Sequence, residues 1–81
     1  MIQVLFFAQV KELVGTASLT LDGEFQSAED IRQHLAEKGD KWALALEQGK
    51  LLVAINQTIS ELSAPVKAGD EVAFFPPVTG G

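Results

Sequence analysis

The fold of this chain is decided by the stretch Glu71-Val72-Ala73-Phe74-Phe75-Pro76-Pro77-Val78-Thr79-Gly80-Gly81. Its first residues are rich in β-branched and aromatic side chains and predict a strand over 71–75. This strand must end at Pro76-Pro77, because proline lacks the N–H that ladder pairing needs. Gly80 and Gly81 have no Cβ, so their backbone can pass through a channel too narrow for side chains. We therefore expect a folded domain over residues 1–75 and an extended, flexible tail over residues 76–81.

The first strand, expected over 2–7, alternates in the same way as the last one. The large apolar side chains that alternation turns toward the core are Ile2, Val4, Phe6, Val72 and Phe74. Because successive side chains of a strand point to opposite faces, Phe7 and Phe75 are left on the other face. If the two strands are neighbours, these two rings form one patch.

Turn signals and periodicity predict the remaining elements. They are a short helical turn at 8–14 closed by Gly15, a strand at 16–21, a helix from the N-cap Ser27 to about Lys38 stopped by Gly39, a short helix at 42–46, a strand at 51–55, a turn at Asn56-Gln57, a short edge strand at 58–60 and a turn at 68–70. One main helix packed on a mixed sheet, with the first and last strands parallel at its centre, is an α+β, ubiquitin-like β-grasp fold.

Composition limits the kind of function that the domain can have. The 81 residues include no cysteine, which excludes a disulfide framework, a thiol nucleophile and a cysteine-based zinc site. The net charge of −5 disfavours nucleic acids and anionic membranes and favours a basic partner surface. No run of apolar residues is long enough to cross a bilayer, and no signal-peptide pattern opens the sequence, so we expect a cytoplasmic protein.

Several segments resemble one family in order and spacing. They are Val4–Ala8, Lys11–Gly15, Val53–Gln57 and Gly69–Val72 running into the 74–81 ending. Over its full length the chain is similar to the ubiquitin-like sulfur carriers that form the small subunit of molybdopterin synthase, and most similar to the bacterial ones. The departures are mild: Lys11 stands where arginine is frequent, and Ile59 where leucine is common.

The resemblance implies chemistry at the carboxylate of Gly81. A separate activating enzyme would use MgATP to form a glycyl adenylate, and a persulfide donor would convert it into a thiocarboxylate (1-thioglycine). The tail that presents this group is Pro76, Pro77, Val78, Thr79 and Gly80. Extended at about 3.3 to 3.6 Å per residue, the tail spans roughly 20 Å, and its prolines stiffen its base. This chain would bind no cofactor itself.

The resemblance also implies the partner. The loaded tail would enter the large subunit of molybdopterin synthase, in a heterotetramer of two small and two large subunits. Two carriers in succession would convert cyclic pyranopterin monophosphate into the molybdopterin dithiolene, with the catalytic residues on the large subunit. Phe7, Ile59 and Phe75 are then the expected docking patch beside the tail. The alternative reading of these side chains is a second layer of core.

Other candidate residues are assigned no chemistry. His34 is the only histidine and has no second ligand spaced with it, so we expect a solvated helix position and no metal site. The acidic pair at 29–30 fits helix capping, and Asp70 and Glu71 begin a strand, although either carboxylate could pair with a basic partner rim. Trp42 is expected in the core.

Four other functions remain open on this sequence. The first is the thiamine-pathway sulfur carrier, which uses similar Gly-Gly chemistry but fits the Pro-Pro-Val-Thr tail less well. The second is a protein modifier that joins Gly81 to a lysine amine. The third is a plain β-grasp interaction module with an inert tail, and the last is an independent enzyme.

Overall fold

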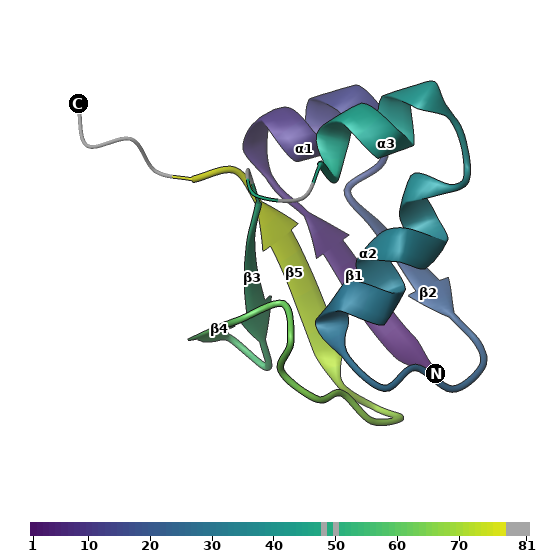
Figure 1. Ribbon diagram of the computed structural model, residues 1–81, viewed down its shortest axis with the longest axis vertical. Coiled ribbons are helices and arrows are strands. Elements are labelled where there is room, and N and C mark those ends of the chain that lie inside the picture. Colours follow the sequence, from purple (N-terminus) through teal and green to yellow (C-terminus); the bar gives the residue numbers. More distant parts are fainter. Residues whose placement is uncertain (48, 50, 78–81) are drawn as a thin grey trace.

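A computed structural model describes residues 1–47, 49 and 51–77 of the chain. Within this part, one sheet has five strands in the order β2-β1-β5-β3-β4. The strands are β1 (Ile2–Phe6), β2 (Ser18–Leu21), β3 (Leu52–Ile55), β4 (Thr58–Ser60) and β5 (Glu71–Phe75). The helices are α1 (Ala8–Val14), α2 (Ala28–Ala36) and α3 (Asp40–Ala45). Helix α2 crosses one face of the sheet, and α1 and α3 lie together near the end where β1 and β5 finish (Figure 1).

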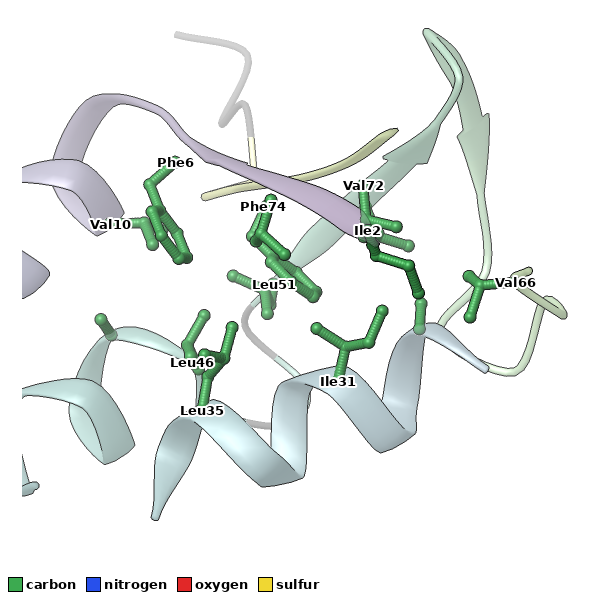
Figure 2. Close-up of a cluster of buried hydrophobic side chains, with 14 residues drawn as sticks. Ile2, Phe6, Val10, Ile31, Leu35, Leu46, Leu51, Val66, Val72 and Phe74 are labelled. Carbon is green, nitrogen blue, oxygen red and sulfur yellow. The ribbon is translucent and has the colours of Figure 1, made fainter. Parts of the chain in front are cut away.

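The centre of the sheet is the parallel pair β1 and β5, in which Val4 lies opposite Val72 and Phe6 opposite Phe74. All four side chains are fully buried. Figure 2 shows Phe74 on the side of the sheet that α2 covers and Phe6 beside Val10 of α1. The rings of Phe6 and Phe74 stack with centroids 6.4 Å apart. The parallel pairing and the main helix over one face confirm the predicted β-grasp fold.

Helix α2 supplies the other half of this core. Its N-cap is Ser27, whose Oγ accepts a hydrogen bond from the N–H of Asp30 at 3.2 Å, while the Asp30 carboxylate accepts from the N–H of Gln26 at 3.0 Å. The first bond satisfies an N–H group that the first helical turn leaves unbonded, and the second ties the chain just before the N-cap to the helix. Ile31 and Leu35, four residues apart, then point into the core (Figure 2). The helix ends at Ala36 and not at Lys38 as predicted.

Other boundaries differ from the prediction by one or two residues, and one residue was misplaced. Strand β1 ends at Phe6 and not at Phe7, and β3 begins at Leu52 and not at Leu51. Strand β2 begins at Ser18 and not at residue 16, because the Thr16 hydroxyl donates to the Ser18 carbonyl and forms a local turn. Helix α3 spans Asp40–Ala45 instead of 42–46. Trp42 is only partly buried: its ring meets Phe6 edge-on at 5.6 Å and lies 5.3 Å from the Lys38 ammonium, so it packs against the side of the core.

Candidate functional site

The open face of the sheet, opposite α2, carries a row of apolar side chains. Register places Leu5 beside Ala73, Ala73 beside Ala54, and Ala54 beside Ile59, so the row runs across β1, β5, β3 and β4. Phe75 lies two residues along β5 from Ala73 and therefore on the same face. The row surrounds a hollow of about 550 Å³.

We call this the docking hollow. Its lining residues are Leu5, Phe7, Ala54, Gln57, Ile59, Glu71, Ala73 and Phe75. All three residues that the sequence analysis placed in a docking patch are among them. Phe7 is 48% exposed and Ile59 is 67% exposed, whereas Phe75 is half-buried. The structure brings these three residues to one hollow, and their contact with a partner stays a prediction.

The junction between β1 and α1 explains the position of Phe7. Its N–H donates to the Phe74 carbonyl at 3.2 Å, which continues the parallel pairing one residue beyond β1. Phe7 remains extended, with φ −127° and ψ 155°, and the next residue, Ala8, has a φ of +52°. Since this left-handed residue redirects the chain into α1, the Phe7 ring stays on the sheet's open face.

The residues where the predicted tail begins line two different cavities. Phe75 lines the docking hollow, and Pro76 lines a second cavity of about 300 Å³ between α1 and α3. Leu13 and the 61%-exposed Leu44 also line that second cavity. Pro77 is exposed. The predicted tail residues Val78, Thr79, Gly80 and Gly81 lie outside the described residues.

Sequence reasoning missed four residues of the docking hollow: Leu5, Ala54, Gln57 and Ala73. Gln57 was interpreted only as part of a turn. For two of them the signal was available, because Leu5 has the same parity as Phe7 and Ala73 the same parity as Phe75. Ala54 needed the pairing register of β3, which composition does not reveal.

The two acidic residues at the start of β5 have different surroundings. Asp70 is 7% exposed, and its carboxylate accepts hydrogen bonds from the Asn56 side-chain amide at 3.0 Å and the Lys67 N–H at 2.9 Å. These bonds, that from Asn56 first, hold the pKa of Asp70 below its ordinary value. Asp70 therefore secures the turn before β5 and is not the rim charge that the sequence analysis considered. Glu71 lines the docking hollow.

The other candidates lie away from this hollow. His34 is exposed, as predicted, and its ring packs edge-on against Phe25 at 5.3 Å. Across residues 1–47, 49 and 51–77, no three acidic or histidine side chains are grouped so that they could hold a metal ion. None of the helices in this part of the chain is long and apolar enough to span a bilayer.

Comparison with known proteins places the chain in a family. The ThiS family model matches residues 4–81. The chain belongs to the ThiS family. A protein from Haemophilus influenzae named molybdopterin synthase sulfur carrier subunit is 65% identical to this chain over 81 residues, which is 100% of both chains.

Two solved structures resemble this chain in fold. One is a complex of subunits 1 and 2 of molybdopterin-converting factor from Helicobacter pylori, matched with a TM-score of 0.66 and 27% identity over 99% of this chain and 97% of that one. The other is small archaeal modifier protein 1 from Methanosarcina acetivorans, with a TM-score of 0.79 and 26% identity over 99% and 95% of the two chains.

Proposed function

We propose that this chain is the sulfur-carrying small subunit of a molybdopterin synthase. The observation that carries the proposal is the 65% identity to a sulfur carrier subunit of that enzyme along every residue of both chains. The modifier from Methanosarcina acetivorans shares the fold at 26% identity, so likeness to it supports the β-grasp body and does not favour a modifier role. The thiamine-pathway carrier is likewise not favoured.

The reactive group of the proposal is the carboxylate of Gly81. A C-terminal carboxyl has a pKa of about 3.5, so at neutral pH it is an anion and a poor electrophile. Attack of this anion on the α-phosphate of ATP, with Mg²⁺ on the activating enzyme, would expel pyrophosphate and form the acyl adenylate. A persulfide sulfur would then displace AMP, and a thiol on the donor side would supply two electrons to cleave the S–S bond. The product is a thiocarboxylate, which is an anion and a strong nucleophile.

The docking hollow accounts for delivery of this sulfur. Strand β5 ends at Phe75, in the lining of the hollow, and Pro76 follows directly. A partner that covers the hollow therefore also stands at the base of the tail. In the proposal this partner is the large subunit, which provides the catalytic residues, and the assembly is a cytoplasmic heterotetramer. The complex of subunits 1 and 2 from Helicobacter pylori supports a partner of this kind.

Mass spectrometry of the intact chain tests the proposal. The chain would be isolated from cells that hold the activating enzyme and the persulfide donor, and from cells without the activating enzyme. We expect a species with one oxygen replaced by sulfur in the first preparation only. Peptides that carry Gly-Gly branches on lysine, with no sulfur-bearing species, would show a protein modifier instead.

A reconstituted assay then identifies the pathway. The sulfur-loaded chain would be mixed with the large subunit and cyclic pyranopterin monophosphate, and molybdopterin would be measured. The unloaded chain is the control. Sulfur loading without any molybdopterin would refute the synthase role and leave the thiamine-pathway reading.

A further inference from the structure

We infer that the docking hollow receives one branched aliphatic side chain of the large subunit, seated over Ala54 and Ala73, and that a lysine or arginine of the same subunit pairs with Glu71. The inference rests on the proposed function, because it names what the partner must present to this site.

The floor of the hollow consists of two alanines that lie directly opposite each other in the β3 and β5 pairing. Larger side chains stand on either side in the same row, with Leu5 next to Ala73 and Ile59 next to Ala54. Ala73 is only 8% exposed although it faces away from the core, because its taller neighbours shield it.

This shape selects a protruding side chain. A flat partner surface would rest on Phe7, Phe75 and Ile59 and would leave an empty space above the alanines. The side chains that line such an empty space lose dispersion contacts, so well-packed interfaces contain few spaces of this kind. A side chain that reaches the floor fills the space, and a branched aliphatic one adds apolar area there without a polar atom that needs a hydrogen bond.

The charge of the partner follows from Glu71, which is half-buried beside the apolar lining. Its N–H donates to the Asn56 side-chain oxygen at 3.0 Å, but within the described residues its own carboxylate has no hydrogen bond or ion pair. When a partner covers the hollow, this carboxylate loses water. An unpaired buried charge is costly, so the partner must bring a cation to the same place. The net charge of −5 favours a basic surface for the same reason.

The first experiment fills the floor. Ala73→Val adds two methyl groups above it, and valine suits a strand, so the variant should fold. Ser18→Val is the matched control: Ser18 is exposed on β2, lies in the same row beside Leu5, and does not line the hollow. We expect Ala73→Val to weaken binding to the large subunit, measured by calorimetry, by about tenfold or more, and Ser18→Val to leave it unchanged.

The second experiment removes the rim charge. We expect Glu71→Gln to weaken binding by about tenfold at low salt and to flatten the salt dependence of the affinity. Glu37→Gln, an equal charge change at the exposed C-cap of α2, is the control and should bind like the unaltered chain. Each basic residue of the large subunit's contact surface would then be replaced in turn. One of these replacements should weaken binding to the unaltered chain but not weaken binding to Glu71→Gln any further.

The outcomes separate the inference from the proposed function. If the unaltered chain binds the large subunit and both Ala73→Val and Glu71→Gln bind equally well, the inference is overturned and the sulfur-carrier function stands. If the unaltered chain does not bind the large subunit, the proposed function fails and the inference fails with it. Self-association of the carrier alone that disappears in Ala73→Val would assign the hollow to a second copy of the chain and overturn the inference.

Discussion

Phe74 and Phe75 are adjacent in β5 and lie on opposite faces of the sheet. Phe74 is fully buried between the sheet and α2, where its ring stacks on Phe6. Phe75 lines the docking hollow on the open face, immediately before Pro76. The same strand, in the middle of the sheet, thus supplies a buried core residue and the residue that precedes the predicted tail.

Alanine at these two positions should separate stability from binding. Phe74→Ala leaves a cavity in the core and should lower the free energy of unfolding by about 3 to 5 kcal/mol. Phe75→Ala should lower it less, because the ring is half-buried, and should weaken binding to the large subunit about tenfold. Urea denaturation and calorimetry measure the two effects. Unchanged affinity in Phe75→Ala would remove this residue from the docking patch.

Arg32 should contribute to stability by joining two helices. It is 9% exposed, its Nη1 donates to the Leu46 carbonyl at 2.8 Å, and it forms a bidentate pair with Glu29 at 2.6 and 2.7 Å. The hydrogen bond from Arg32 is the main reason that the pKa of Glu29 is lowered. Arg32→Met leaves the carbonyl and the carboxylate without this donor and should cost about 1 to 3 kcal/mol of unfolding free energy.

The control for this variant is Lys41→Met, which removes an equal charge from an exposed position of α3. We expect its urea midpoint to stay near that of the unaltered chain. If the two methionine variants were equally stable, the bond between Arg32 and the end of α3 would contribute nothing.

Local signals were sufficient to predict much of the fold. Side-chain alternation placed Phe6 and Phe74 inside, Ser27 marked the start of α2, and Gly15 marked the end of α1, where its φ is +82°. These features depend on residues close together in the sequence or on a fixed strand period. The start of β2 moved by two residues, where the Thr16 hydroxyl forms a local bond.

Contacts between distant residues could not be predicted in this way. The bond from Arg32 to Leu46 and that from Asn56 to Asp70 each join residues 14 apart. From the sequence alone, Arg32 on a helix and Asp70 before a strand would be predicted to be solvated charges. Their partners come close only in the folded chain. The two alanines at the floor of the docking hollow were not predicted for a related reason. A small side chain indicates a hollow only when its neighbours across the sheet are known.

Asp70 should make stability depend on pH in the acid range. Its pKa is lowered in the folded state, so the unfolded chain binds the proton first and stability falls as pH falls. This contribution is complete above the ordinary pKa of an aspartate, about 3.9, and is lost as pH drops through the lower folded pKa. The stability difference between the unaltered chain and Asp70→Asn should therefore be largest at neutral pH and shrink in acid. Urea denaturation from pH 7 to pH 3 measures this difference, and Asp22→Asn, at an exposed position, is the control. A difference that stays constant with pH would contradict this role.

Deletion of Gly81 should separate docking from sulfur transfer. The folded domain is expected over 1–75, so the shortened chain should melt like the full one. It should still bind the large subunit through the docking hollow, because Phe7, Ile59 and Phe75 are intact. It should yield no molybdopterin in the reconstituted assay, and in excess it should inhibit the loaded full chain by competing for the same partner surface. Molybdopterin formed by the shortened chain would refute sulfur carriage on Gly81, and loss of binding would locate the affinity in the tail instead of the hollow.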